Sequence, residues 1–258
     1  MAKKRRLAES LDEEELAYVT SKMLPEKEGI NTPSAKLLNF KLKLKCKNQH
    51  QKELHNLIKE KQIVFCQGSA GTGKSYIAGE TALELLKNGG YRRIIICCPN
   101  VESSSMPLGL LPGTVDEKMQ PYMDAIEFTL TKILDESGNF NSKEIITNLL
   151  KNDVIVEEAA AFLRGKTFDD SIIIIDESEN FNKQELLLIL TRIGRNSKMV
   201  FLGDNQQIDR RDIKKSGEKC GLDHAIEALK GIDDIGFLQF SEEDIVRNPI
   251  ITEILNKW

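Results

Sequence analysis

The chain has 258 residues, of which 40% are hydrophobic and 29% are charged, and its formal net charge at pH 7 is −4. This length and balance are typical of a water-soluble protein with one large domain or two small ones. No apolar run approaches the ~20 residues that a membrane-spanning helix requires, which excludes a helical membrane protein.

The start of the chain and its cysteines indicate a cytoplasmic protein. The basic residues Lys3 to Arg6 are not followed by an apolar segment, so no secretory signal is expected. The five cysteines include no C-x-x-C pair, and three of them stand in apolar, strand-like segments. Reduced core thiols explain this pattern better than disulfides or a zinc site. The three scattered histidines likewise indicate no metal site of their own.

The first part of the chain is polar and basic. Residues 1–40, with an acidic helix-like stretch at 10–23, show no evident core, and we interpret them as an N-terminal extension. In the sequence KLKLKCK, from Lys41 to Lys47, lysines alternate with apolar residues, which predicts a strand with one cationic face. That face is either a solubilising sheet edge or a surface that follows the phosphate backbone of a nucleic acid.

Residues 41–258 alternate between apolar, β-rich segments and helical patterns. The predicted strands are Ile63–Cys66, Ile94–Cys98, Ile172–Ile175, Met199–Leu202 and Ile235–Phe240. Predicted helices, each stopped by glycine, are Ser75–Lys87, Lys183–Ile193 and Asp223–Lys230. A helical insertion at about 116–163 separates the second strand from the third. Continuous apolar runs suit strands buried on both faces, so we expect one α/β domain whose mostly parallel sheet is covered by helices.

The segment GSAGTGKS follows the first predicted strand and opens a helix, and it matches the phosphate-binding pattern G-x-x-x-x-G-K-[ST]. Its glycines allow backbone N–H groups to surround phosphate oxygens, and the helix adds its positive end. Lys74 is expected to bridge the outer phosphates, and Ser75 to give its hydroxyl to Mg²⁺. The expected nucleotide-binding residues are Gly68, Ser69, Ala70, Gly71, Thr72, Gly73, Lys74 and Ser75.

Two adjacent acids end the third predicted strand, in SIIIIDESEN. The carboxyl edge of an open α/β sheet is where ligands bind, so Asp176 is expected to hold magnesium. Glu177 distinguishes hydrolysis from mere binding, because an enzyme that directs water at the γ-phosphate needs a general base there. On the next strand, GDNQQ follows an apolar run and places Gln207 where it can sense the γ-phosphate.

Together these motifs resemble the PhoH-like (phosphate-starvation-inducible) P-loop ATPases, which are similar to the first motor domain of superfamily 1 helicases. The resemblance runs from about Gln51 to the end of the chain and rests on GSAGTGKSYIA, LGLLPGTVDEKMQPY, AAFLRGKTF, IIIIDESEN, LTRIGRNSKMVFLGDNQQID and EEDIVRNPII. It departs where the family usually has DEAQN, because Glu179 here replaces a glutamine, and where Cys98 replaces the usual arginine before Pro99. Small versions of this kind are similar to those of bacteriophages.

The resemblance implies a RecA-like core that binds ATP and Mg²⁺ and acts on RNA or single-stranded DNA, within a homo-oligomer, most simply a hexameric ring. Gln51 stands where helicase-like relatives place an adenine-recognising glutamine, with Gln49 and a purely structural role as the alternatives. Phosphoryl transfer also gains from an arginine placed on the developing charge. With one motor core in the chain, Arg247 and Arg164 are the candidates for an arginine given to a neighbouring subunit, and a structural salt bridge is the alternative for each.

Three other classes of function are less well matched by the sequence. A small-molecule kinase needs an arginine-rich lid, but the insertion at 116–163 carries no arginine cluster. A ribonuclease needs a second cluster of metal-binding acids, which the motifs do not supply. A non-hydrolysing assembly or regulatory module needs Lys74 but has no use for Glu177, and it is the main alternative.

Overall fold

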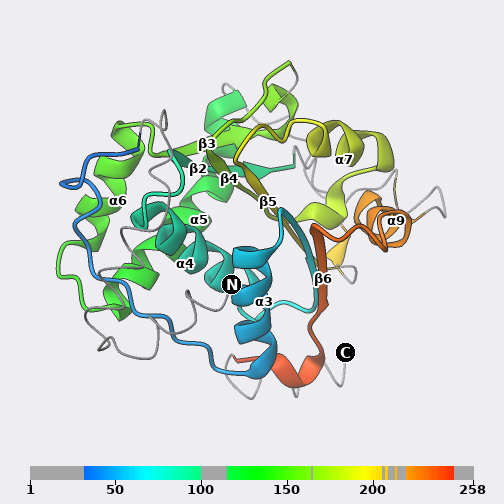
Figure 1. Ribbon diagram of the computed structural model, residues 1–258, viewed down its shortest axis with the longest axis horizontal. Helices are drawn as coiled ribbons and strands as arrows, with labels where there is room; N and C mark the ends of the chain where they lie inside the picture. Colours follow the sequence, from blue (N-terminus) through cyan, green and yellow to red (C-terminus); the bar gives the residue numbers. More distant parts are fainter. Residues whose placement is uncertain are drawn as a thin grey trace, which may run out of the picture. The chain divides into compact units, whose positions relative to one another are not determined.

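The computed structural model describes residues 32–99, 115–163, 165–204, 207–208, 213 and 219–246 (Figure 1). Contacts divide the chain into two units, Met1–Asn31 and Thr32–Trp258, and every element below belongs to the second. The helix-like stretch expected at 10–23 lies outside the described residues. Leu38 and Phe40 are buried in the core, so the second unit already includes the last residues of the expected extension.

The second unit alternates strands and helices. Its strands are β1 (Ile63–Gln67), β2 (Arg93–Cys98), β3 (Ile155–Ala159), β4 (Ser171–Ile175), β5 (Lys198–Gly203) and β6 (Ile235–Gln239). Its α-helices are α3 (Gln49–Glu60), α4 (Lys74–Lys87), α5 (Val115–Glu136), α6 (Ser142–Lys151), α7 (Lys183–Leu190) and α9 (Gly221–Ala228). Short 3₁₀ turns follow three strands: η2 (Ala160–Leu163), η3 (Ser178–Asn180) and η5 (Glu242–Asp244). In the part of the chain that the structure describes, no helix combines the length and apolarity needed to cross a membrane.

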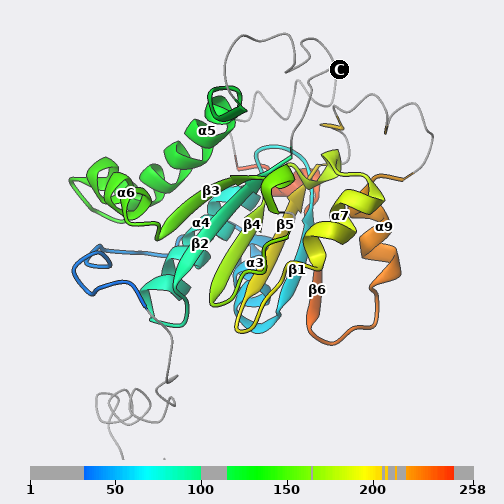
Figure 2. The same ribbon diagram turned by 90° about the horizontal axis from the view of Figure 1, so that it is seen from above.

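The six strands form one sheet in the order β3-β2-β4-β5-β1-β6, and every pairing is parallel (Figure 2). The predicted α/β fold with a parallel sheet is therefore confirmed. β5 lies between β1 and β4, with Gln67 opposite Gly203 and Ile175 opposite Phe201. The carboxyl ends of these three strands consequently meet at one edge of the sheet.

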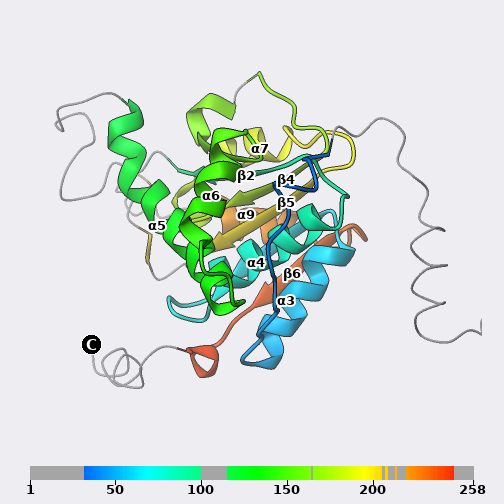
Figure 3. The same cartoon turned by 90° about the vertical axis from the view of Figure 1, so that its left-hand side faces the viewer.

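Helices cover both faces of the sheet, and alternate strand residues supply the two cores. Val64, Cys66 and their neighbours pack against apolar residues of α3, α4, α5 and α6. Phe65 and its neighbours pack against α7 and α9 on the opposite face. Figure 3 shows α3 and α4 on one side of the sheet and α7 on the other. Burial on both faces explains why the strands are continuous apolar runs.

The expected helical insertion at 116–163 contains a strand that the sequence analysis missed. β3 follows α5 and α6 and pairs with β2, at the end of the sheet order. Its sequence, IVEEA, has two adjacent glutamates and no apolar run. An edge strand has one neighbour and a partly solvated surface, so it does not carry the sequence pattern of a central strand.

The strand predicted at Lys41–Lys47 is wrong. These residues, here called the cationic segment, adopt no regular secondary structure. Their backbone bonds to side chains instead: Lys41 N–H donates to Asn139 Oδ1 at 2.8 Å, and Lys43 N–H donates to Ser137 Oγ at 3.0 Å. Leu42 and Cys46 pack against the core. Leu44, between them, is 40% exposed, so the alternation marks a segment that contacts the core at two points and is not paired in a sheet.

The aromatic stack beneath the sheet predicts a large difference between two phenylalanine substitutions. Phe65 stacks on Phe201 with ring centroids 4.8 Å apart, and Phe201 is fully buried. Phe201→Ala should therefore lower the free energy of unfolding by ~3–5 kcal/mol in urea titrations. Phe140, which is fully exposed, is the matched control, and Phe140→Ala should change that value by less than ~0.5 kcal/mol. Equal effects would contradict the assigned core.

Candidate nucleotide-binding site

The glycine-rich loop connects β1 to α4 at the carboxyl edge of the sheet. Gly73 has φ +88°, a backbone conformation that side-chain-bearing residues rarely adopt. A Cβ atom at Gly73 would also lie 2.8 Å from the side-chain nitrogen of Gln51. Both constraints fix glycine directly before Lys74, where the loop becomes the first turn of α4.

Lys74 and Ser75 begin α4, and their side chains face the loop and the neighbouring acid. The buried Lys74 ammonium donates to the carbonyl oxygens of Gly68 at 2.5 Å and Ser69 at 3.1 Å. The Ser75 hydroxyl donates to Asp176 Oδ2 at 2.8 Å. The structure thus brings together a cation, a hydroxyl and a carboxylate from the two segments in which the sequence predicted them.

The two acids after β4 have different surroundings. Asp176 accepts from Ser75 and, through Oδ1, from the backbone N–H of Glu177 at 3.0 Å. Burial, followed by the charge of Glu177, raises the pKa of Asp176. Glu177 is exposed at the cavity and has a left-handed backbone, with φ 53°. The two adjacent carboxylates therefore differ in exposure, although both line the cavity.

The site fits Mg²⁺ bound together with a nucleotide. Mg²⁺ takes oxygen ligands and is commonly held by one or two protein oxygens plus substrate phosphates and water. Ser75 Oγ and Asp176 Oδ2 form such an oxygen pair beside the loop. A cation there would also relieve the burial of the Asp176 carboxylate close to Glu177. Among the described residues there is no group of three or more His, Cys, Asp or Glu that could hold a metal by itself.

β5 adds a further link between the loop and the acids. Asp204, directly after β5, accepts through Oδ2 from the Ala70 N–H at 2.9 Å. The carbonyl of Asp204 accepts from the backbone N–H of Gln207 at 2.9 Å. Gln207 lines the same cavity as the loop, the position expected of a residue that senses the outer phosphate.

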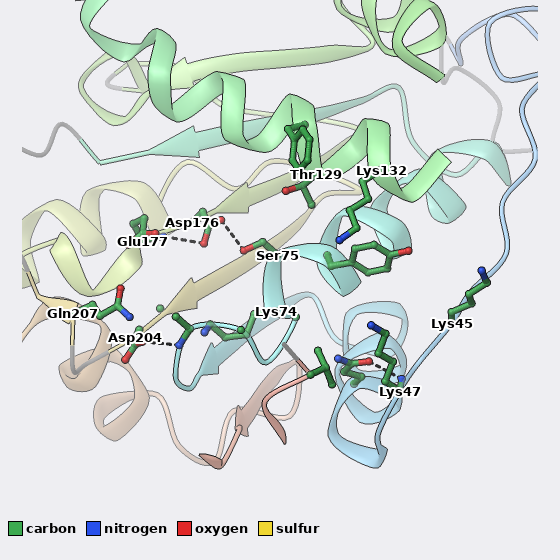
Figure 4. Close-up of a pocket in the computed structure, with 18 of the residues that line it drawn as sticks. Lys45, Lys47, Lys74, Ser75, Thr129, Lys132, Asp176, Glu177, Asp204 and Gln207 are labelled. Atoms are coloured by element: carbon green, nitrogen blue, oxygen red, sulfur yellow. Dashed lines mark hydrogen bonds between the residues drawn. The ribbon is translucent and has the colours of Figure 1, made fainter. Parts of the chain in front are cut away.

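These residues surround a cavity of about 430 Å³, a size typical of small-molecule and cofactor sites. Figure 4 shows Glu177, Asp204 and Gln207 on one side of Lys74 and Ser75, and Lys45 and Lys47 on the other. The lining residues come from the cationic segment, α3, the loop, the start of α4, α5, η3, the end of β5, the segments after β4 and β5, and the segment after η5: Lys45, Lys47, Gln51, Ala70, Gly71, Gly73, Lys74, Ser75, Tyr76, Phe128, Thr129, Lys132, Glu136, Asp176, Glu177, Glu179, Gly203, Asp204, Gln207 and Val246.

Gln51 lies under the loop. Its Nε2 donates to the carbonyl of Thr72 at 2.8 Å, and its Oε1 accepts from the Lys47 N–H at 2.7 Å. Only 3% of the residue is exposed. The side chain therefore connects the cationic segment to the phosphate loop through backbone groups at both of its ends.

Several lining residues were not predicted from the sequence. They include Asp204, which accepts a hydrogen bond from the loop, and the side of the cavity formed by Tyr76, Phe128 and Lys132. Tyr76 directly follows Ser75 and could have been included by its position alone. Phe128 and Lys132 come from α5, where no motif marks them. Arg164 and Arg247 lie outside the described residues, so the structure does not locate either arginine.

Comparison with known proteins identifies a family. The family model described as PhoH-like protein matches residues 43–258. The PhoH-like protein of Bacillus subtilis (strain 168) is 34% identical over 215 residues, 83% of this chain and 64% of that protein. Protein PhoH of Escherichia coli (strain K12) is 30% identical over 214 residues, 81% of this chain and 57% of that protein. The chain thus spans less than two thirds of the length of these relatives.

Solved structures with a similar chain course are more distant. The large terminase of a thermophilic bacteriophage, in complex with ADP, is 11% identical, with a TM-score of 0.47 over 81% of this chain and 49% of that one. The Sulfolobus solfataricus SWI2/SNF2 ATPase core in complex with double-stranded DNA is 13% identical, with a TM-score of 0.45 over 79% of this chain and 46% of that one.

The contacts of Gln51 lead to a test of what this side chain does. If Gln51 holds the loop through Thr72 and Lys47, Gln51→Ala should weaken the binding of ATP and of GTP by similar factors, which we expect from its two backbone contacts. If Gln51 recognises adenine, only the binding of ATP should weaken. Titrations of the parent protein and of Gln51→Ala with fluorescent analogues of both nucleotides give the ratio of the dissociation constants. The exposed α3 residue Glu53, replaced by glutamine, is the control for the helix.

Proposed function

The chain is a P-loop protein that belongs to the PhoH-like family, and we propose that it is a Mg²⁺-dependent ATPase. We further propose that it works in the cytoplasm, where ATP turnover is coupled to the binding or remodelling of RNA or single-stranded DNA. The observation that carries the ATPase proposal is the 2.8 Å contact between Ser75 and Asp176, with Glu177 next to it at the same cavity. The nucleic-acid part rests on the resemblance to helicase motor domains.

In the proposed reaction the loop amides and the Lys74 ammonium hold the outer phosphates, while Ser75 and Asp176 provide the oxygen ligands of the metal ion. Bound Mg²⁺ would supply positive charge to the phosphate oxygens as the bond to the leaving group breaks. Glu177 takes the proton of the attacking water, since its carboxylate faces the cavity beside Asp176. Gln207 and Asp204 report the state of the phosphate, because β5 ends between the loop and the acids.

The ATPase proposal predicts distinct results for three substitutions. Lys74→Ala should abolish turnover and weaken ATP binding, because the charge on the outer phosphates is lost. Asp176→Asn should weaken Mg²⁺-dependent binding. Glu177→Gln should keep ATP and Mg²⁺ bound and lose ~10²–10⁴-fold in turnover, the usual contribution of a general base. Phosphate release and nucleotide titrations measure both quantities, with the exposed Glu60→Gln as the matched control.

The same assay tests the coupling to nucleic acid. Turnover is measured with and without single-stranded RNA and single-stranded DNA at a fixed salt concentration, using Lys74→Ala as the blank. Stimulation by either polymer supports the proposal and identifies the substrate. If neither polymer changes turnover, the proposed coupling of ATP hydrolysis to nucleic acid is wrong. Parent-rate hydrolysis by Glu177→Gln would instead favour a regulatory module for which hydrolysis is not the function.

The activating arginine is proposed to come from a neighbouring subunit of a ring. In that case Arg247→Ala should bind ATP normally and hydrolyse it slowly. Adding Glu177→Gln subunits should restore some turnover, because their intact arginine completes sites that keep their own glutamate. Arg164→Ala is the parallel variant. An Arg247 that acts within its own chain gives no rescue, and a fully active monomer would contradict the shared site.

A further inference from the structure

Glu179 is a glutamate in a place where a charge is costly. It lies in η3, directly after β4, and none of its surface is exposed. An ionised carboxylate out of contact with water needs strong compensation, and otherwise it takes up a proton. The groups that surround this side chain therefore decide its charge.

The Glu179 carboxyl group connects the acid of β4 to the end of β5. Its Oε2 accepts from the Asp204 N–H at 3.0 Å, and its side chain is hydrogen-bonded to Glu177. Asn180 Nδ2 lies 3.4 Å from Oε1. A Cβ atom at Gly203 would lie 2.9 Å from Oε2 and 2.4 Å from Leu222, so the glycine that ends β5 leaves room for this carboxyl group.

Two carboxyl groups can share a hydrogen bond only if one of them keeps its proton. Burial, then the bond to Glu177 and the charge of Glu177, raise the pKa of Glu179 to about 9. Other ionisable groups of the packed elements have partners of their own. Asp204 accepts from Ala70, and Asp223 of α9 accepts from Gln67 and from the Cys220 thiol. No cation forms an ion pair with Glu179 among the residues that the structure describes.

We propose that Glu179 is a positioning residue: a neutral carboxylic acid that donates a hydrogen bond to Glu177 and fixes that carboxylate at the cavity, while Asp204 holds its other oxygen. A neutral carboxylic acid has one O–H donor and an accepting oxygen, whereas a glutamine amide has an accepting oxygen and two N–H donors. An amide could therefore make the same two contacts, but only the acid makes the donated bond dependent on pH. The inference rests on the proposed role of Glu177 as the base.

The first test compares an isosteric with a truncating variant at neutral pH. Glu179→Gln keeps a donor for Glu177 and should retain kcat within ~3-fold, whereas Glu179→Ala should lower kcat by ~10–100-fold, the usual effect of removing a group that orients a functional residue. KM for ATP should change less than kcat, since Glu179 reaches the phosphate loop only through Asp204. If Glu179→Gln loses as much kcat as Glu179→Ala, the amide does not replace the acid and the proposal fails.

The second test is the pH profile, because a purely structural role would not produce it. In the wild type, kcat should fall as the pH rises through about 9, when Glu179 loses its proton and repels Glu177. Glu179→Gln should lack this alkaline decline. The control is Glu80→Gln on α4: Glu80 is also buried, with a pKa raised to about 7 by burial, but it does not line the cavity. Its substitution should leave the alkaline decline in place, and an unchanged decline in Glu179→Gln overturns the proposal.

The third test needs no ATPase activity, so it separates this inference from the proposed function. The pKa of Glu179 is about 9 in the folded protein and 4.5 for an ordinary glutamate. The contribution of the protonated group to folding stability is therefore fully present below pH 4.5, and it is lost as the pH rises to about 9. Tm of Glu179→Gln relative to wild type should therefore rise between these values and then level off. In a Glu177→Gln background the levelling should occur at lower pH, because the neighbouring charge is gone. A pH-independent Tm difference overturns the neutral acid even if no hydrolysis is found.

Discussion

The site depends on the parallel pairing of β5 between β1 and β4. This pairing sets Gln67 opposite Gly203 and Ile175 opposite Phe201, so the phosphate loop, the acid pair and Asp204 leave the sheet at one edge. Central strands whose alternate side chains pack in two different apolar cores cannot shift register by one residue without repacking both cores. The same stacked core that stabilises the sheet therefore keeps the functional groups within hydrogen-bond distance of one another.

That edge concentrates negative charge, and the structure compensates for it with backbone and hydroxyl donors. Asp176 accepts from Ser75 and from a backbone N–H, Asp204 accepts from the loop, and Glu179 accepts from the backbone of Asp204 just after β5. Lys74, at the end of the phosphate loop, supplies a positive charge, but its ammonium donates to loop carbonyls and not to these acids. A site of this kind favours a ligand that carries its own metal ion, because the acids then gain the counter-charge that the protein supplies only in part.

Sequence patterns predicted the parts of this structure that follow from local rules. A glycine at positive φ before Lys74, continuous apolar runs for central strands and acids at a strand end each have a single strong physical cause. β3 was missed because an edge strand can carry Glu157 and Glu158 without an apolar run. The environment of Glu179 could not be foreseen either. Its burial depends on contacts of η3 with β5 and α9, which are far from it in the sequence, and on the space left at Gly203.

In the cationic segment, lysines alternate with apolar residues as in a strand, but the segment is not a strand. Its lysines face outward because Leu42 and Cys46 pack on the core, but no strand pairs with it. Instead Lys45 Nζ donates to the Glu136 carbonyl at the end of α5, and the Lys47 N–H donates to Gln51 beneath the loop. Both lysines line the cavity on the side away from Gln207. Positive charge fixed there complements a polyphosphate, so Lys45 and Lys47 fit the proposed ATP site, whereas Lys41 and Lys43 do not line this cavity.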